Sequence, residues 1–345
     1  MTLRRARTFS ALSASAVALL LTAGCAEESA GGGDSADRPL TIYSGREEEL
    51  VGSVIDDFNK ETGVDVEVRY GDTAELAATI VNEGEASPAD VFWAQDAGAL
   101  GTLEQEGLFA ALPEGVLDVV DQRFRSDEGE WVGVTGRSRV IAYNTEALSE
   151  AEVPKSVFDL TSSQWDGRVG WASTNGSFQA FVTAMRELEG EAATRSWLER
   201  MLANGVQDYS ENTLILEALG RGEIDLGLTN HYYLYRYLAE KPDFPVANAY
   251  PDGDLGALLN VAGVGVLASS DQSESAEGFV EYLLSEPVQS FFGTVTDELE
   301  YPLREGVTAE KLPPLEELDP PEIDLSDLED LQGTLDLLRD VGALE

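Results

Sequence analysis

The stretch that decides the fold is LTIYSGREEELVGSVIDDFNKETGVDVEVRYGDTAELAATIVNEGEASPADVFW, residues 40–93. Leu40–Tyr43 is a short apolar run, and Glu47–Thr62 places apolar residues at helical spacing with acids between them. Val64–Tyr70 then alternates as a strand does, and Ala89–Trp93 is apolar again. Between the last two strands, Asp72 and Glu75 resemble a capping box that opens a second helix. This order of strand, helix, strand, helix and strand predicts a mostly parallel sheet covered by helices. In such a sheet the ligand crevice lies where the strands end and the next helices begin.

A second run of the same kind follows. It contains predicted strands at Arg168–Trp171 and Glu223–Leu228, and a later apolar strand at Val261–Leu267. A chain of 345 residues usually forms two domains or lobes rather than one. We therefore expect two α/β lobes, with the chain crossing between them near Arg139–Asn144 and near Asn260–Gly265.

The chain is strongly acidic. It has 65 Asp and Glu residues against 22 Lys and Arg, for a formal charge of -43, and 43% of its residues are hydrophobic. A surface of this kind repels nucleic acid and anionic lipid, whose binding depends on lysine and arginine. Nucleic acid is therefore excluded as a partner. The acidity favours solubility, and by itself it indicates no metal site.

The amino terminus has the pattern of an export signal. Arginines among the first seven residues precede the apolar run Ala11–Ala23, which is too short to span a bilayer as a mature helix. The run closes with LTAGC, Leu21–Cys25, which resembles a bacterial lipobox with its leucine one place further from the cysteine than usual. In lipoproteins of that kind the cysteine is acylated and becomes the first mature residue, which implies lipidation of Cys25.

Cys25 is the only cysteine in the sequence. A buried core thiol would have to stand inside a domain, whereas Cys25 precedes Ala26–Asp37, a stretch rich in Gly, Ser and acids that is typical of a flexible tether. The lipoprotein interpretation places the protein outside the cytoplasm, anchored to the outer face of the cell membrane through its lipid alone. A single cysteine also excludes disulfides and thiolate metal sites within the chain.

These patterns predict a division of the chain into six parts. They are a signal peptide 1–24, a lipidated cysteine and tether 25–38, lobe 1 at 39–138, lobe 2 at 139–261, a return to lobe 1 at 262–312, and a C-terminal helical segment 313–345. The last part begins rich in proline and acids before Leu328–Leu338 resumes helical spacing.

Six short stretches of the chain are informative when they are taken together and in order. They are IYSGRE at Ile42–Glu47, EGEASPADVFW at Glu83–Trp93, GRSRV at Gly136–Val140, STNGSF at Ser173–Phe178, GEID at Gly222–Asp225 and NHYY at Asn230–Tyr233. In order and spacing they resemble the ferric-iron-binding proteins of ABC importers, across nearly all of Thr41–Pro302. No stretch is diagnostic alone, but the ordered set is specific. The resemblance implies an α/β, two-lobed, periplasmic-binding-protein-like (type II) fold with a ligand cleft between the lobes.

In that family two consecutive tyrosines bind Fe(III) through their phenolates, and they match Tyr232 and Tyr233. Fe(III) is small and highly charged, so it prefers anionic oxygen donors. A bound metal also displaces the phenol proton far below its free pKa of ~10. From the tyrosines alone, an aromatic helix face that also includes Tyr235 and Tyr237 and packs on the core is the simpler interpretation. The surrounding family pattern favours the ligand interpretation.

The resemblance implies further iron ligands at Glu47, Gln95 and Asp96. Many members carry a histidine where Glu47 stands and a glutamate where Gln95 stands, so this sequence departs from the pattern at both positions. Glu47 is either an oxygen ligand or, with Glu48, a first-turn residue that complements a helix amino terminus. Asp96 can substitute for the missing glutamate if its loop shifts slightly. The sole histidine, His231, is predicted to be a cap or surface residue.

Members of the family often complete the iron coordination with a bound phosphate or carbonate. The matching positions are Asn175, Gly176, Ser177, Asn212 and Asn230. Small residues and amide donors at the head of a helix suit an oxyanion, although Asn175-Gly176 also fits an ordinary helix-entry turn.

Two arginines lie close to the predicted lobe crossing. Arg137 and Arg139 either lend positive charge to the cleft or pair with acids at the crossing. We expect pairing with acids for at least one of them.

The implied function is the capture of Fe(III), with phosphate or carbonate as synergistic anion, by a monomeric extracytoplasmic binding protein that serves an ABC transporter permease. The nearest alternative is a protein of the same fold that carries another small solute, such as a polyamine, thiamine, a phosphonate or another anion. A secreted hydrolase is a remote alternative. The sequence has one histidine and neither a G-x-S-x-G nor an H-E-x-x-H pattern, so we expect that the protein is not an enzyme.

Overall fold

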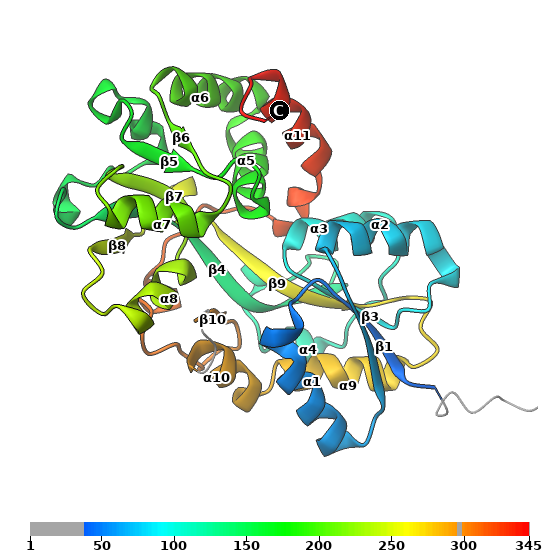
Figure 1. Cartoon of the computed structure of the whole chain (residues 1–345). Helices are drawn as coiled ribbons and strands as arrows, with labels where there is room; N and C mark the ends of the chain where they lie inside the picture. Colours follow the sequence, from blue (N-terminus) through cyan, green and yellow to red (C-terminus); the bar gives the residue numbers. More distant parts are fainter. Residues whose placement is uncertain (1–37, 295–298, 345) are drawn as a thin grey trace, which may run out of the picture. The chain divides into compact units, whose positions relative to one another are not determined.

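Two strands run through the middle of the structure and connect its parts (Figure 1): β4, Trp131–Asn144, and β9, Leu259–Val266. The computed structural model describes residues 38–294 and 299–344, which belong to one unit, Ser35–Glu345. The predicted signal peptide, Cys25 and nearly all of the predicted tether lie outside the described residues. Within the described ranges, none of the helices has the length and apolar character needed to cross a membrane.

The remaining strands are β1 Leu40–Ser44, β2 Val66–Tyr70, β3 Val91–Ala94, β5 Val169–Trp171, β6 Gln207–Asp208, β7 Leu226–Asn230, β8 Val246–Ala249 and β10 Tyr301–Pro302. The α-helices are α1 Glu48–Thr62, α2 Thr73–Glu83, α3 Ala97–Gln105, α4 Glu114–Leu117, α5 Gly176–Glu189, α6 Glu191–Ala203, α7 Asn212–Gly220, α8 Tyr232–Glu240, α9 Ser273–Leu283, α10 Glu286–Thr294 and α11 Leu331–Asp340. A 3₁₀ helix, η9, covers Leu325–Glu329.

The strand order is β2-β1-β3-β9-β4-β7-β5-β6, and β8 and β10 also pair with β4. β4 changes partner along its length: Trp131–Ser138 pairs with β9, and Arg139–Asn144 pairs with β7 and β8. We call β1, β2, β3, β9, β10 and the amino part of β4 the first half of the sheet. The carboxyl part of β4 with β5, β6, β7 and β8 is the second half. The chain thus passes from one half to the other inside a continuous strand.

The prediction of a mostly parallel sheet is correct for the pairs among β1, β2 and β3 and among β5, β6 and β7, and wrong for the pairs that involve β4 or β9. β1 pairs in parallel with β2 and β3, and β5 pairs in parallel with β6 and β7. β9 is antiparallel to β3 and β4, and β4 is antiparallel to β7 and β8. A crossover helix returns the chain in the same direction and so gives a parallel pair, whereas the crossing strands have no such connection to their neighbours.

The predicted elements occur with small shifts at their ends. The helix predicted at Glu47–Thr62 is α1, and it ends at Gly63, whose φ of 76° forms a left-handed C-cap. The apolar stripe of α1 faces the core through Val51, Val54, Ile55 and Phe58. β7 begins at Leu226, later than predicted, because Gly222 and Glu223 still close the turn that ends α7.

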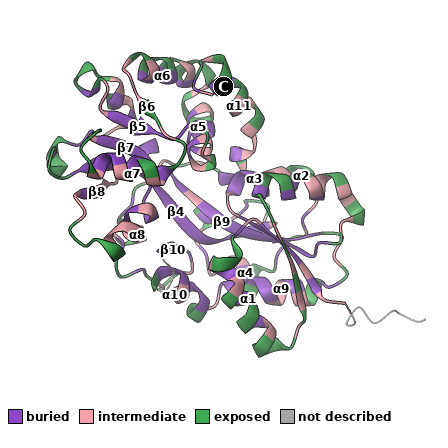
Figure 2. Cartoon of the chain, viewed as in Figure 1, coloured by how far each residue is buried: buried purple, intermediate pink, exposed green. Residues whose placement is uncertain are grey.

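Buried residues, purple in Figure 2, run along most strands of both halves, and separate aromatic groups fill the interior of each half. In the first half, Trp93 packs edge-to-face on Phe279 with ring centroids 5.9 Å apart. In the second half, Trp171 contacts Phe178 at 5.0 Å and Trp197 at 6.0 Å. Between these groups every residue of β4 is buried. The crossing strand is therefore covered along its whole length.

The chain ends in a segment that contacts both halves. We call Leu325–Asp340, which comprises η9 and α11, the C-terminal strap. On the first half η9 packs against α3, where a Cβ on Gly98 would overlap the carbonyl oxygen of Leu328 and a Cβ on Gly101 would overlap that of Ser326. The two glycines therefore permit a close backbone contact that larger residues would prevent.

On the second half α11 packs against α5. Arg186 Nη2 lies 2.8 Å from Asp330 Oδ2, and the hydroxyls of Thr183 and Thr334 form a buried hydrogen bond of 2.7 Å. The C-terminal strap therefore joins α3 of the first half to α5 of the second half.

Candidate functional site

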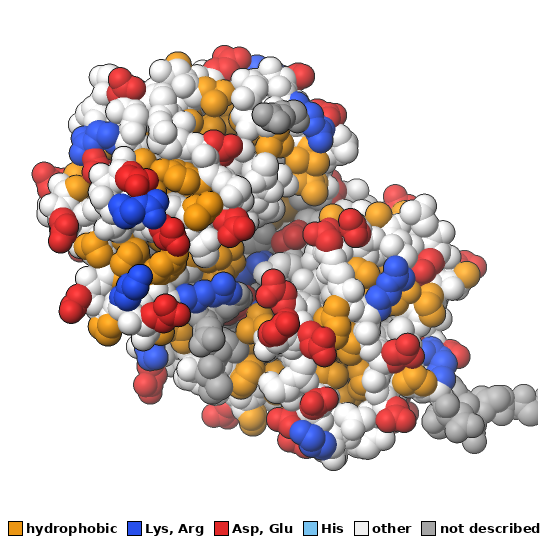
Figure 3. All heavy atoms as spheres, viewed as in Figure 1, with side chains coloured by type: hydrophobic (Ala, Val, Ile, Leu, Met, Phe, Trp, Pro, Cys, Tyr) orange, Lys and Arg blue, Asp and Glu red, His pale blue; other side chains and the backbone are white. Residues whose placement is uncertain are grey.

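A cavity of about 420 Å³ lies between the two halves of the sheet. Its walls come from segments that follow β1, β2, β3, β5 and β7, as expected for a crevice at strand carboxyl ends. Acidic side chains cover both halves of the face seen in Figure 3, and the surface is hollowed between the halves. The residues that line the cavity are Gly45, Glu47, Gly71, Asp72, Thr73, Gln95, Asp96, Arg137, Arg139, Asn175, Gly176, Ser177, Ala180, Asn230, Tyr232, Tyr233, Leu258 and Asn260.

All the predicted metal and anion residues except Asn212 line this cavity. Asn212 is buried at the start of α7, behind the wall, and its Nδ2 donates to Ser177 Oγ at 3.5 Å. In the part of the chain that the structure describes, no three His, Cys, Asp or Glu side chains come together in a way that could hold a metal ion. A metal in this cavity would therefore depend on the tyrosines.

Tyr232 and Tyr233 form the first turn of α8, directly after β7 and His231. Their ring centroids lie 4.3 Å apart with 34° between the ring planes. Tyr232 is buried, and burial raises the pKa of its phenol above the ordinary value. The neighbouring Tyr233 adds to this rise, while Arg137 and a hydrogen bond from Asn230 act against it. The pair therefore presents two phenol groups side by side, and at least that of Tyr232 is protonated near neutral pH.

The other two tyrosines of α8 have packing roles. Tyr237 stacks on Phe244 with ring centroids 4.8 Å apart, and its hydroxyl donates to the carbonyl oxygen of Thr213 at 3.2 Å. Tyr235 packs against the ring of His231 at 6.4 Å. The aromatic helix face considered from the sequence therefore exists, but Tyr232 and Tyr233 differ from the rest because they line the cavity.

Arg139 is a buried cation on the cavity wall. Its Nη1 donates to Ser177 Oγ at 3.0 Å and to Asn230 Oδ1 at 3.1 Å, while its Nε and Nη2 have no hydrogen-bond partner among the residues that the structure describes. Burial lowers the pKa of Arg139 to about 10, and only the neighbouring Tyr233 and Tyr232 raise it. Buried polar groups are normally paired, so these unpartnered N–H groups in a cavity indicate a place for a negatively charged oxygen.

Arg137, the other arginine at the crossing, is paired with an acid, as predicted for at least one of the two. Its Nε lies 4.0 Å from Glu300 Oε1. Glu300 is fully buried, and it accepts hydrogen bonds from Arg46 at 3.0 and 2.7 Å and from Thr135 at 2.7 Å. Burial opposes its ionisation, but the charges of Arg46 and Arg137 outweigh this effect and the pKa of Glu300 is lowered.

Arg46 also reaches the cavity through Gln95. Its Nη1 donates to Gln95 Oε1 at 2.7 Å. Neither Arg46 nor Glu300 was predicted from the sequence as part of the site. Arg46 lies inside Ile42–Glu47, one of the stretches that carry the resemblance, which is the single sequence signal for it. Glu300 stands 254 residues further along the chain and is brought there only by the fold.

The first half contributes three carboxylates to the cavity lining, those of Glu47, Asp72 and Asp96, of which Asp72 caps α2. Glu47 is exposed and lines the cavity; it occupies the N-cap position of α1 but makes no capping hydrogen bond with its side chain. Glu48 lies in the first turn of α1 and does not line the cavity. Asp96 lines the cavity and caps α3, where it accepts from the amide of Ala99 at 3.3 Å. Burial raises the pKa of Asp96, and the charge of Arg137 partly offsets this.

The amino terminus of α5 faces the cavity from the second half. Asn175 caps the helix by accepting from the amide of Ser177 at 3.0 Å, and Gly176 is the first helical residue. Amide groups at such a terminus attract anions. Arg139, which contacts Ser177, adds a full positive charge at the same place.

His231 is not a surface residue, so that alternative of its prediction is wrong, whereas its place at the start of α8 agrees with the other alternative, a helix cap. Its ring is fully buried, with Ser138 N donating to Nδ1 at 3.2 Å and Nε2 lying 2.9 Å from the carbonyl oxygen of Leu299. Burial lowers the pKa of His231 to about 4. It stands at the N-cap position of α8 without capping through its side chain. Antiparallel pairing of β7 with β4 turns this ring inward, and the local pattern does not reveal that pairing.

Residues 86–323 match the model of one protein family, the bacterial extracellular solute-binding proteins. The chain belongs to this family. The solute-binding protein is 35% identical to the Fe(3+)-binding periplasmic protein of Serratia marcescens, over 90% of this chain and 92% of that protein. It is 34% identical to the major ferric iron-binding protein of Neisseria meningitidis, over 88% of this chain and 92% of that protein.

Solved structures show the same relationship. Iron-bound HitA from Pseudomonas aeruginosa has a TM-score of 0.79 and 36% identity, and the match covers 88% of this chain and 99% of that one. FutA from Trichodesmium, in complex with iron and citrate ligands, has a TM-score of 0.78 and 28% identity, with coverage of 88% and 99%. The solute-binding protein therefore has the α/β, two-lobed fold of periplasmic binding proteins.

Proposed function

We propose that this solute-binding protein captures Fe(III) together with an oxyanion in the cavity, with the phenolates of Tyr232 and Tyr233 as iron ligands. The observation that carries the proposal is the pair of adjacent phenols beside a buried arginine without a charge partner. The relatives named for ferric iron binding support the same assignment.

The remaining iron ligands come from the opposite wall. Glu47 and Asp96 supply carboxylate oxygens, and Gln95 is the third candidate at that wall. Asn175, Gly176, Ser177 and Asn230 hold the anion, with Asn212 orienting Ser177 from behind. This donor set is all oxygen and partly anionic, which matches the preference of a small trivalent cation.

The charges of the site support an accompanying anion. Fe(III) with two phenolates leaves one positive charge, and the carboxylates of Glu47 and Asp96 bring the metal complex to about one negative charge. Of the buried arginines near the cavity, Arg46 and Arg137 share Glu300, and Arg139 has no acid partner within residues 38–294 and 299–344. A phosphate or carbonate beside Arg139 would therefore neutralise the arginine and accept hydrogen bonds from its unpartnered N–H groups. The formal charge of the whole chain, -43, conceals this local positive region.

The two halves of the sheet correspond in this proposal to lobe 1 (39–138 and 262–312) and lobe 2 (139–261), with 313–345 as a C-terminal addition. The change of strand partner between Ser138 and Arg139 supports the first boundary. Ligands on opposite walls would stabilise a closed arrangement, because only contacts with both lobes shift the population toward closure.

Delivery to a membrane partner completes the proposal. An extracytoplasmic monomer, held at the membrane by a lipid on Cys25, would present the loaded form to an ABC transporter permease. Binding rather than catalysis is the role that the cavity supports, since its functional groups are ligands and counter-charges.

The test is a visible-absorption titration of lipid-free protein with chelated Fe(III), with and without phosphate. Phenolate-to-iron charge transfer gives a colour that carboxylates alone do not give. A saturable band near one iron per protein, absent from the double variant Tyr232→Phe/Tyr233→Phe, is the expected result. The absence of a band under every anion condition would overturn the proposal.

A second experiment addresses the alternative solutes. Polyamines and thiamine are cations, and they would face the unpartnered charge of Arg139, which disfavours them. A phosphonate would suit Arg139 but would leave the tyrosine pair without a role. Calorimetry with a polyamine, thiamine and a phosphonate, each in the absence of iron, should therefore give no saturable heat.

A further inference from the structure

The orientation of Gln95 is fixed by Arg46. Gln95 Oε1 lies 2.7 Å from Arg46 Nη1. A guanidinium carries only hydrogen-bond donors, so the Gln95 atom that faces it must be the amide oxygen. The backbone amide of Gln95 is held as well, because it donates to Thr73 Oγ1 at 3.1 Å. The polar atom that remains for the cavity is the side-chain nitrogen, Nε2, which is a donor.

Arg46 is itself held in place. Its side chain is 1% exposed, and it makes a two-point ion pair with Glu300, whose side chain is 0% exposed. The two hydrogen bonds measure 3.0 and 2.7 Å. A buried bidentate pair of this kind resists rearrangement, because separating the two side chains would leave unpaired charges in the low-dielectric interior of the protein. The Gln95 oxygen therefore has a fixed partner that is not a metal.

We propose that Gln95 is a hydrogen-bond donor to the anion that accompanies iron, oriented by the Arg46–Glu300 pair, and is not an iron ligand. The inference rests on the proposed ferric function. An amide nitrogen with two hydrogens cannot coordinate iron, whereas it can donate to a phosphate oxygen. The anion would then be held by α5 and Arg139 from the second half and by Gln95 from the first half.

This arrangement gives the anion a specific role. Since Gln95 and the α5 terminus lie on opposite walls, an oxyanion that reaches both makes contacts that exist only when the halves are close. A tetrahedral anion with several acceptor oxygens, such as phosphate, meets this requirement. Gln95 is therefore the residue that makes iron retention depend on the identity of the anion.

The experiment compares wild type with Gln95→Leu and Gln95→Glu, and with Gln207→Leu as a control at an exposed glutamine of β6. Each protein receives one equivalent of Fe(III), and phosphate is titrated while the charge-transfer band is recorded. In Gln95→Leu the phosphate concentration for half-maximal colour should rise roughly tenfold to a hundredfold, the usual effect of losing a hydrogen bond to a charged group. The position of the band should stay unchanged, because no iron ligand is lost.

Gln95→Glu has no N–H to donate and introduces the carboxylate that many family members carry at this position, so it should contact iron directly and shift the band, whereas Gln95→Leu should not. Arg46→Lys, which removes the bidentate partner, should raise the phosphate requirement in the same direction as Gln95→Leu. A Gln95→Leu protein whose band shifts, or whose iron affinity falls equally with and without phosphate, would identify Gln95 as an iron ligand and overturn the inference. A wild-type protein without any band would instead overturn the ferric function itself, so the two failures are distinguishable.

Discussion

Arg139 Nη1 lies 3.1 Å from Asn230 Oδ1, so the last residue of β7 positions a buried cation without neutralising it. Asn230 immediately precedes His231 and the tyrosine pair. The same short segment therefore sets the place of the cation and of the phenols. An uncompensated buried charge destabilises the folded protein, and we interpret this cost as the consequence of a site that is complete only with its anion.

Arg139→Met should raise the stability of the iron-free protein and at the same time weaken its binding of iron in phosphate. The pKa of Arg139 is lowered to about 10 from 12.5, which corresponds to roughly 3 kcal/mol of unfavourable charge burial. Loss of two hydrogen bonds offsets part of this, so the iron-free variant should be more stable by about 1–2 kcal/mol in urea unfolding. Its iron affinity in phosphate should fall at least tenfold.

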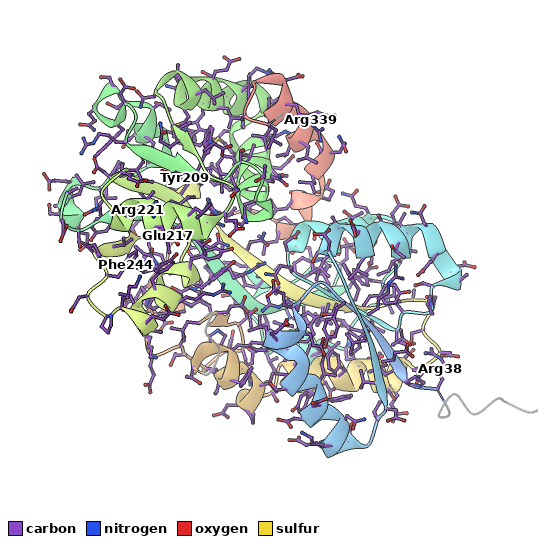
Figure 4. The ribbon with its side chains drawn as sticks, in the orientation of Figure 1. Arg38, Tyr209, Glu217, Arg221, Phe244 and Arg339 are labelled. Carbon is purple, nitrogen blue, oxygen red and sulfur yellow. The ribbon has the colours of Figure 1, made fainter. Side chains whose placement is uncertain are left out.

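The matched control for this change is Arg221→Met. Arg221 is exposed and pairs with Glu217 at 3.1 Å and with Glu223 at 2.7 Å, on the outer side of the second half near Phe244 (Figure 4). Its replacement should leave iron affinity unchanged. An iron-free Arg139→Met protein that is less stable than wild type would show that Arg139 has a structural role in place of an anion-binding one.

Tyr232→Phe should change the pH dependence of iron binding. Burial holds the pKa of Tyr232 above its ordinary value, so iron must displace a proton from it at any pH below that value. Affinity at a phenolate site therefore rises up to tenfold per pH unit for each proton released. The variant should release about one proton fewer in an unbuffered titration, and its band should weaken. Tyr237→Phe, whose hydroxyl contacts Thr213, should release as many protons as wild type.

His231→Gln should remove one component of acid sensitivity from the iron-free protein. The pKa of His231 is about 4 in the folded state against 6.5 for an unperturbed histidine. The unfolded chain therefore binds the extra proton first, and stability falls as the pH drops from about 6.5 toward 4, by roughly 3 kcal/mol. Below pH 4 this contribution is fully lost.

The sequence holds no other histidine, so the slope between pH 6.5 and 5 in urea unfolding should be clearly smaller in the variant. Equal slopes in the two proteins would show that His231 is not the group responsible.

Gly101→Ala should loosen the C-terminal strap. A Cβ there would overlap the carbonyl oxygen of Ser326, so η9 must move away from α3, at a cost of about 1–3 kcal/mol. Gly278→Ala in the middle of α9 is the control, because a Cβ at that position meets nothing within 4 Å. It should stabilise the protein by about 0.5–1 kcal/mol through helix propensity. Thermal unfolding of both variants measures the difference, and a neutral Gly101→Ala would exclude the close contact.

Much of the fold follows from local pattern. Alternating apolar residues and the stripe on α1 predict β1, α1, β2 and β3 almost to the residue, since each element buries one face on its neighbour. The direction of β9 does not follow from its own residues. An apolar strand buried on both faces looks the same whichever way it runs, so its antiparallel pairing with β3 emerges only from the whole topology.

The residues of the candidate site also divide into those that the sequence predicts and those that only the fold brings together. Tyr232, Tyr233 and the Asn175–Ser177 turn were predicted on the strength of the family resemblance, and the structure places them at one cavity. The burial of His231 and the lack of a partner for Arg139 depend on which segments pack around them, and no spacing in the sequence encodes that. The contact of Arg46 with Glu300 likewise depends on the packing of distant segments and cannot be predicted from the sequence.

The Arg46–Glu300 pair also has a consequence for how the protein is made. Its members are 254 residues apart, so the cavity cannot acquire its final wall until nearly the whole chain has emerged from the ribosome or crossed the membrane. A nascent chain that ends before residue 300 would already contain both tyrosines and Gln95, but it would lack the carboxylate that holds Arg46 against the glutamine. Gln95 therefore takes its final orientation only at the end of biosynthesis, after every other group proposed for the site has been made.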